Sequence, residues 1–215
     1  MSWKSYLFPQ TVLITSSPYN HHIRVNEEWG KMKLIVNGSP QSGSYIEMLW
    51  KKTLTHFSIP KKPIHSALIL GLGGGTVLTI LSRIFPGIRQ TCVDIDKTII
   101  GIAKKYFLVD SIPHLIIVES DAELYVRRIA QEKKKYDVVI IDLSFGRNIP
   151  SFVSKKYFLK HIYTLITPRG CLLFNYLREK EYKDKSDVLF QTLQSIFSDV
   201  SDFEIANNRF FCCRI

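Results

Sequence analysis

The stretch that decides the fold is HSALILGLGGGTVLTILSRIFPGIRQTCVDID, residues 65–96. An apolar run of strand length leads into a glycine cluster, a segment with helical spacing follows, and a second apolar run ends on two aspartates. This order predicts the first strand–helix–strand unit of a parallel sheet covered by helices. In such sheets ligands bind beyond the carboxyl ends of the strands, which is where the glycines fall.

The same alternation of apolar runs and amphipathic segments continues towards the end of the chain. Because these strands are apolar throughout, we expect them to be buried on both faces. The last two runs, 200–206 and 209–215, have only Asn207-Asn208 between them, which predicts a hairpin at the sheet edge. The predicted fold class is α/β: a Rossmann-like, mostly parallel sheet with an antiparallel C-terminal hairpin.

A different pattern precedes this alternation. Three short β-like runs, 11–17, 22–28 and 31–36, are separated by turn signals and followed by a helical segment over about 44–57. They predict a small antiparallel sheet with a connecting helix. We place the boundary at the PKKP segment, which gives an N-terminal β domain over residues 1–62 and a Rossmann-like domain over residues 63–215.

The composition is that of an ordinary globular chain, with 215 residues and 46% hydrophobic content. Pro9 interrupts the apolar segment near the N-terminus and no apolar run reaches membrane-spanning length, so we expect a cytoplasmic protein that does not enter membranes. The four cysteines lie in strand-like runs and are expected to be buried and reduced. His21-His22 has no further ligands in the pattern, so no metal site is predicted.

The formal net charge of +10 raises the question of an acidic partner. The basic residues are scattered in pairs and one triplet and form no dedicated tract, which favours solvated surface. We therefore expect a small-molecule acceptor, with an acidic macromolecule such as RNA as the alternative. A homodimer is compatible with the sequence.

The glycine cluster, Gly71 to Gly75, has a physical use at this turn. Glycines let a ligand approach the backbone, and the following helix offers free N–H groups to an anionic group. Asp94, at the end of the next strand, can accept both hydrogen bonds from a ribose diol. A simple tight turn is the alternative. The NAD-binding pattern needs a glycine at Thr76, whereas Gly71, Gly73 and Gly75 show the alternate spacing typical of S-adenosylmethionine-dependent transferases.

A more specific resemblance covers most of the chain. The segments ALILGLGGGTVL, CVDIDKTII, VESDAELYV, YDVVIIDLS and RGCLLFNY resemble the spermidine synthase (polyamine aminopropyltransferase) family and its methyltransferase-like relatives. The N-terminal segments VNGSPQ and YIEMLW also resemble the small N-terminal domain of that family. The resemblance implies the class I methyltransferase fold, with S-adenosylmethionine or its decarboxylated form as cofactor.

The resemblance also implies a set of site residues. Those expected at the cofactor are the glycines and the residues at the ends of the next two strands: Gly71, Gly73, Gly74, Gly75, Asp94, Ile95, Asp121 and Ala122. Asp94 takes the ribose position, and Asp121 with Ala122 contacts adenine. Asp142 falls on the aspartate that deprotonates the attacking amine. The residues expected at the acceptor are Gln41, Tyr45, Ser144 and Phe145.

Two departures from the family pattern bear on the reaction. Gly74 stands where aminopropyltransferases carry an aspartate that holds the propylamine nitrogen of the cofactor, and Phe145 stands where they carry a second substrate-binding aspartate. We therefore favour methyl transfer to an unidentified acceptor. The alternatives are aminopropyl transfer to an unusual amine, and a non-catalytic adenosyl-binding or interaction domain.

Three side chains have a structural interpretation beside the functional one. Asp142 can act as a general base or merely accept hydrogen bonds from loop N–H groups at a strand end. Asp121 can be the N-cap of the helix that follows it. For Trp50 a place in the hydrophobic core is favoured over a place in the acceptor pocket.

Overall fold

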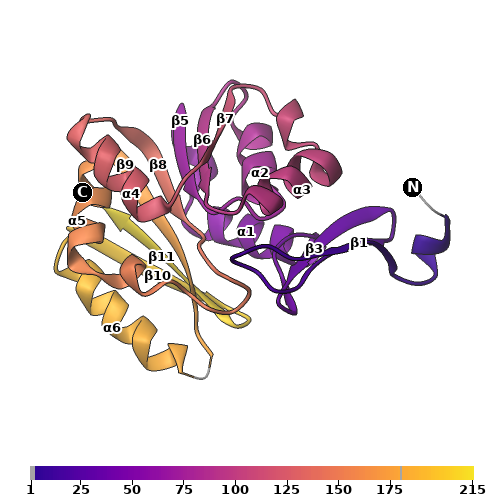
Figure 1. The fold of residues 1–215 in the computed structure, drawn as a ribbon. Coiled ribbons are helices and arrows are strands. Elements are labelled where there is room, and N and C mark those ends of the chain that lie inside the picture. The colour runs from indigo at the N-terminus through magenta and orange to yellow at the C-terminus, as the bar shows by residue number, and fades with distance from the viewer. Residues whose placement is uncertain (1–2, 180) are drawn as a thin grey trace.

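The computed structural model describes residues 3–179 and 181–215. It contains a small antiparallel sheet and a large mixed sheet (Figure 1). The N-terminal elements are η1 (Trp3–Tyr6), β1 (Gln10–Thr15), β2 (Ile23–Glu28), β3 (Lys31–Val36), β4 (Ser39–Pro40), α1 (Ser44–His56) and η2 (Ile59–Lys61). The elements of the first half of the large sheet are β5 (Ser66–Leu70), α2 (Thr76–Ile84), β6 (Arg89–Asp94), α3 (Lys97–Phe107), η3 (Val109–Ser111), β7 (Leu115–Glu119) and α4 (Ala122–Gln131). Those of the second half are β8 (Tyr136–Ile141), η4 (Ser151–Ser154), α5 (Lys156–Thr164), β9 (Ile166–Leu177), α6 (Tyr182–Gln194), β10 (Asp199–Ile205) and β11 (Asn208–Arg214).

The large sheet confirms the predicted fold class. Its seven strands run in the order β10-β11-β9-β8-β5-β6-β7, and β5 to β9 pair in parallel. The strand order switches at β5: the chain first adds β6 and β7 on one side of it and then β8 and β9 on the other side. The loops that follow β5, β6 and β8 therefore meet at the carboxyl ends of the strands, where ligands bind in open α/β sheets.

The predicted C-terminal hairpin is also confirmed. β10 and β11 pair antiparallel from Asp199–Arg214 to Ile205–Asn208, and β11 pairs antiparallel with β9. β10 is the edge strand. The turn of this hairpin lies beside the end of β9, because Asn208 pairs with Leu177.

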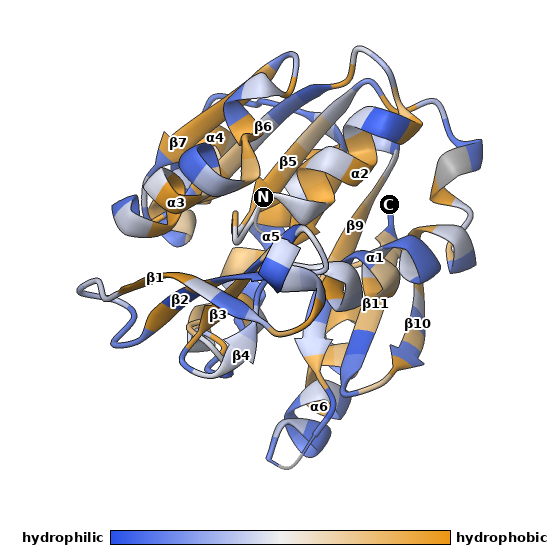
Figure 2. Cartoon of the chain, turned by 90° about the vertical axis from the view of Figure 1, so that its right-hand side faces the viewer, coloured by the Kyte–Doolittle hydropathy of each residue, from blue (hydrophilic) through white to orange (hydrophobic). Residues whose placement is uncertain are grey.

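The large sheet has a hydrophobic core on each face, where helices pack against its strands. In β5, Ala67 and Ile69 pack with α1, α2 and α3, whereas Leu68 and Leu70 pack with α4, α5 and α6. Figure 2 shows the apolar colouring of the central strands and of the inner helix surfaces. All four cysteines are buried and free, as the sequence predicted.

The small sheet has the strand order β1-β2-β3-β4 and projects from the large one as an arm (Figure 1). Its inner face packs Ile23, Val25 and Leu34 against Ile99 and Ile102 of α3. The connecting helix α1 shares its core with the large sheet rather than with the arm. The domain boundary between residues 62 and 63 stays a prediction.

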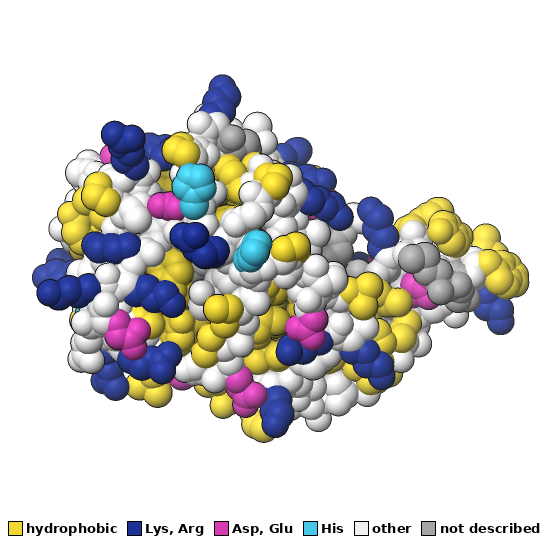
Figure 3. All heavy atoms as spheres, turned by 90° about the horizontal axis from the view of Figure 1, so that it is seen from above, with side chains coloured by type: hydrophobic (Ala, Val, Ile, Leu, Met, Phe, Trp, Pro, Cys, Tyr) yellow, Lys and Arg dark blue, Asp and Glu magenta, His cyan; other side chains and the backbone are white. Residues whose placement is uncertain are grey.

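The described surface carries its charges in a dispersed way. Figure 3 shows Lys and Arg side chains spread across the face that it presents, while apolar side chains gather at the projecting end. The exposed apolar residues at that end include Trp3, Leu7, Phe8 and Trp29. None of the described helices is long and apolar enough to cross a membrane. Within the described ranges, no three His, Cys, Asp or Glu side chains are grouped so as to hold a metal ion.

Candidate functional site

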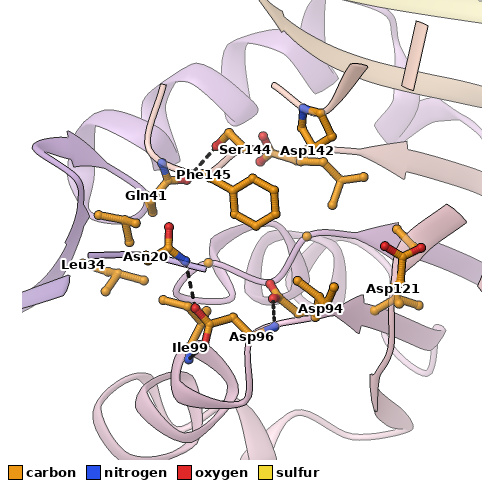
Figure 4. A pocket seen from close by; sticks show the side chains of 18 of the residues that line it. Asn20, Leu34, Gln41, Asp94, Asp96, Ile99, Asp121, Asp142, Ser144 and Phe145 are labelled. Carbon is orange, nitrogen blue, oxygen red and sulfur yellow. Dashed lines mark hydrogen bonds between the residues drawn. The ribbon is translucent and has the colours of Figure 1, made fainter. Parts of the chain in front are cut away.

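A cavity opens at the carboxyl ends of β5, β6 and β8, beside the glycine loop; we call it the glycine-loop cavity. Six of the eight residues expected at the cofactor line it, namely Gly71, Gly73, Asp94, Ile95, Asp121 and Ala122. Asp94, Asp121 and Asp142 surround it, with the ring of Phe145 between Asp142 and Asp94 in the view of Figure 4. The loops of the large sheet therefore bring together residues that are far apart in the sequence.

Asp94 fixes the floor of this cavity. Its two carboxylate oxygens accept the backbone N–H groups of Leu72 at 2.9 Å and of Asp96 at 2.9 Å. Burial raises the pKa of Asp94, and backbone hydrogen bonds from Asp96, Leu72 and Ile95 oppose the rise. A carboxylate has about four lone-pair positions, so these bonds leave acceptor capacity for a hydroxyl donor that enters the cavity.

The glycine loop passes very close to the next strand end. Gly71 has φ +100°, and a Cβ built on it would lie 2.1 Å from the backbone oxygen of Asp142. No other residue fits there without movement of the backbone. Gly71 thus places the loop directly beside the carboxyl end of β8.

Gly74 and Gly75, the other two residues expected at the cofactor, are not among the residues that line this cavity. A Cβ on Gly74 would lie 2.6 Å from Cβ of Ser42 and 3.0 Å from the ring of Phe107. The side-chain direction of Gly74 therefore points to a space that Ser42 already fills. Gly75 is the N-cap residue of α2 and faces Val109.

Asp121 has the structural role that the sequence allowed. It is the N-cap residue of α4, and its Oδ1 accepts the N–H of Leu124 at 2.9 Å. The other carboxylate oxygen has no hydrogen bond among the described residues, and Asp121 lines the glycine-loop cavity together with Ala122. Capping and ligand binding are therefore compatible at this residue.

The segment after Asp142 is held by the small sheet. The side chain of Gln41 donates to the backbone oxygen of Gly146 at 3.1 Å and accepts the hydroxyl of Ser144 at 3.4 Å. Phe145 stacks on Tyr19, with ring centroids 6.1 Å apart. Phe145 was expected at the acceptor, but it lines the glycine-loop cavity.

A second cavity, of about 220 Å³, lies between α1, the Asp142 segment and the C-terminal hairpin; we call it the hairpin cavity. Gln41, Tyr45 and Ser144, three of the four residues expected at the acceptor, line it. Its aromatic lining consists of Tyr45, Trp50, Tyr176 and Phe210. Asp142 lines both cavities and so lies at their junction.

The carboxylate of Asp142 is held by two neutral donors. The indole N–H of Trp50 donates to Oδ2 at 3.1 Å, and the amide of Asn175 donates to Oδ1 at 2.8 Å. Asn208, from the hairpin, donates in turn to Asn175 at 2.8 Å. Burial raises the pKa of Asp142, and the bonds from Asn175 and Trp50 oppose the rise. No cationic side chain is bonded to Asp142 among the described residues, so the site can accept a cation or a proton.

Sequence reasoning missed several of these contacts. Trp50 is buried as expected for a core residue, yet its N–H reaches Asp142. Asn175 and Asn208 gave no signal, because only strand pairing brings them to the site.

Asp96 had a usable signal, since an aspartate just before a helix predicts an N-cap. It caps α3 and also accepts the side chains of Ser17 and Asn20 from the small sheet.

Comparison with known proteins now decides the family. Residues 47–205 match the family described as the spermine/spermidine synthase domain. This chain belongs to that family. The resemblance read from the sequence is thereby confirmed, and the departures at Gly74 and Phe145 mark the chain as a divergent member.

The curated proteins similar in sequence to this chain include transferases of two kinds, aminopropyltransferases and methyltransferases. A polyamine aminopropyltransferase of Vibrio vulnificus is 28% identical over 72% of this chain and 50% of its own length. An eEF1A lysine and N-terminal methyltransferase homolog of Drosophila pseudoobscura pseudoobscura is 29% identical over 68% of this chain and 22% of its own length. The chain thus spans half of the first relative and about a fifth of the second.

Solved structures support the fold. Spermidine synthase from Thermotoga maritima superposes with a TM-score of 0.75 at 18% identity, over 94% of this chain and 72% of that one. Human methyltransferase-like protein 13, solved in complex with SAH, gives a TM-score of 0.64 at 23% identity over 73% of each chain. The spermidine synthase family fold therefore covers nearly the whole molecule, the arm included.

Proposed function

We propose that this member of the family transfers a methyl group from S-adenosylmethionine to an amine on a small-molecule acceptor. The observation that carries the proposal is the packing at Gly74. In aminopropyltransferases this position is expected to hold an aspartate for the propylamine nitrogen. Here Ser42 and Phe107 occupy the space into which such a side chain would extend. An aspartate, or any Cβ, does not fit at Gly74, which supports a cofactor without a free propylamine.

The glycine-loop cavity fits the adenosyl part of such a cofactor. Free lone pairs of Asp94 suit a ribose diol, and the free oxygen of Asp121 suits the amino group of adenine. Apolar side chains of Ile95, Ala122 and Phe152 supply walls for a flat base. When bound there, S-adenosylmethionine supplies a methyl group on a positively charged sulfur.

Asp142 is placed to prepare the acceptor. An ammonium group at the junction of the two cavities would give its proton to the Asp142 carboxylate, because burial raises the proton affinity of that carboxylate. The freed nitrogen lone pair forms the bond to the methyl carbon, the bond from that carbon to sulfur breaks, and sulfur keeps the electron pair. Positioning of the nitrogen in line with this bond supplies much of the rate increase.

Aminopropyl transfer is the second candidate, and one observation favours it. Among the described residues, those that line the glycine-loop cavity include Asp94, Asp96, Asp121 and Asp142 but no Lys, Arg or His. An acidic lining suits the additional ammonium of decarboxylated S-adenosylmethionine better than the carboxylate of S-adenosylmethionine.

The test is product analysis with both cofactors. Purified protein is incubated with either cofactor and a metabolite extract, and products are identified by mass spectrometry, with Asp142→Asn as the control. Methylated amines that disappear with Asp142→Asn are the expected result. Aminopropyl products would establish the second candidate. Binding of S-adenosylhomocysteine without either product would identify a non-catalytic adenosyl-binding domain and overturn the proposal.

A further inference from the structure

The hairpin cavity is charged at two places and neutral elsewhere. Among the described residues that line it, Asp142 is the one acidic side chain and Arg147 the one basic side chain. Its other polar lining residues, such as Asn175, Asn207 and Asn208, carry no charge. A ligand that fills this cavity therefore meets a carboxylate at the junction with the glycine-loop cavity and a guanidinium at a second point.

Arg147 is held in place by the fold of its segment. It lies in a tight turn in which the backbones of Phe145 and Asn148 bond to each other at 2.8 and 3.2 Å. Gln41 anchors this turn through Gly146. A Cβ on Gly146 would lie 2.8 Å from Cβ of Asn37, so the turn packs tightly on the small sheet. The backbone at Arg147 is thus held by the same contacts that shape the cavity.

The guanidinium keeps binding capacity although it is already paired. Its Nη2 contacts Oε1 of Glu179, while 56% of the Arg147 side chain stays exposed. A guanidinium has five N–H donors, and this contact uses one of its nitrogens. Glu179 is 19% exposed and does not line the cavity. The remaining donors suit a carboxylate, which an arginine can bind through two parallel hydrogen bonds.

We propose that the acceptor is a small zwitterion, an amino acid whose amine lies at Asp142 and whose carboxylate is bound by Arg147. This inference rests on the proposed function, since it assigns the reacting amine to Asp142. It specifies the chemical group at the end of the acceptor opposite the reacting amine, which the methyl-transfer reaction does not determine.

A diamine is the natural competitor, and the charges disfavour it. Its second ammonium would approach the guanidinium of Arg147, a like charge, and the described lining of the cavity has no second carboxylate to offset this repulsion. To reach Glu179 instead, it would have to displace Arg147 from its ion pair. An alkylamine avoids the repulsion but leaves Arg147 without a ligand partner.

The test uses ligands of equal chain length that differ at the far end. Binding of 4-aminobutyrate, 1,4-diaminobutane and butylamine is measured by calorimetry on the full chain saturated with S-adenosylhomocysteine, and repeated with the five- and six-carbon series. At the best length, the amino acid should bind at least about tenfold more tightly than both others, the range expected for hydrogen bonds between charged groups. No transfer step is needed, so a failure of the proposed methyl transfer would not change this ranking.

Three variants at the ion pair and one control variant separate ligand binding from loop structure. Arg147→Gln should remove the preference for the amino acid, and Arg147→Glu should reverse it in favour of the diamine. Glu179→Gln frees Arg147 and should keep the preference. Arg127→Glu makes the same charge change on an exposed residue of α4 and should have no effect. A diamine preference, equal binding of the three ligands, no binding of any of them, or equal effects of Arg147→Gln and Glu179→Gln would overturn the proposal.

Discussion

Trp50 donates its indole N–H to the Asp142 carboxylate across a separation of 92 residues. The indole also packs edge-on against Phe210, with ring centroids 5.1 Å apart. Its position is therefore set by the hydrophobic core, and the core in turn sets the direction of the carboxylate. A buried aromatic residue here determines how a charged group faces a cavity.

Trp50→Phe should retain the contact with Phe210 but remove one donor from Asp142. Losing a hydrogen bond to the ionised form raises the pKa of Asp142 further above its ordinary value. A base must be ionised to act, so the acid limb of the pH–rate profile should move to higher pH. The control Trp29→Phe alters an exposed tryptophan outside both cavities and should leave the profile in place. An unshifted profile for Trp50→Phe would show that the indole does not tune Asp142.

Asp94→Ala should weaken binding of S-adenosylhomocysteine by roughly 1.5–3 kcal/mol, the value of hydrogen bonds to a charged group. Calorimetry measures the loss, and circular dichroism checks the fold, because Asp94 also holds the N–H groups of Leu72 and Asp96. Asp110→Ala removes a carboxylate that is 60% exposed and should bind normally. Unchanged affinity of a folded Asp94→Ala protein would remove Asp94 from the ribose site.

Asp121→Asn separates capping from cofactor binding. Asparagine caps helices about as well as aspartate, so the melting temperature without ligand should stay close to that of the native protein. The increase in melting temperature on adding S-adenosylhomocysteine should be smaller, because the amide lacks the second acceptor oxygen. Asp121→Ala should in addition lose about 1 kcal/mol of stability with its cap. A full ligand-induced increase for Asp121→Asn would contradict a role at adenine.

Gly74→Ala should destabilise the protein by about 1–3 kcal/mol, since its Cβ would overlap Ser42. Gly101→Ala is the matched control: no atom lies within 4 Å of its Cβ position, and alanine favours the helix in which Gly101 lies. Chemical unfolding of both variants measures the difference. Tolerance of alanine at Gly74 would reopen the space for the propylamine-binding aspartate and favour aminopropyl transfer.

The parts of this molecule that follow from local pattern could be predicted. The apolar strands, the glycine turn after β5 and the position of Asp94 at the end of β6 each depend on a few neighbouring residues. The hairpin was predictable because a short turn joins β10 to β11. Family resemblance extended this reading to the expected site residues.

Contacts between distant segments could not be read in the same way. The order of the sheet brings Asn175 to Asp142, and the packing of α1 brings Trp50 there. Phe145 belongs to the expected segment, but a tight turn directs its ring to the glycine-loop cavity. The overlap of Gly74 with Ser42 depends on how the arm meets the loop. In each case the decisive neighbour is distant in sequence and has no fixed spacing.

Asp96 joins the arm to the floor of the glycine-loop cavity, where its backbone N–H bonds Asp94 while its side chain bonds Ser17 and Asn20. A ligand held by Asp94 would therefore also restrain the first turn of α3 and the β1–β2 connection, which contributes Ser17 and Asn20. Ligand binding in the cavity and docking of the arm are then thermodynamically linked: ligand binding should make docking of the arm more favourable, and docking should tighten ligand binding. Amide protons of β2 and β3 should exchange more slowly with solvent when the cavity is filled, so the arm reports on a site that it only borders.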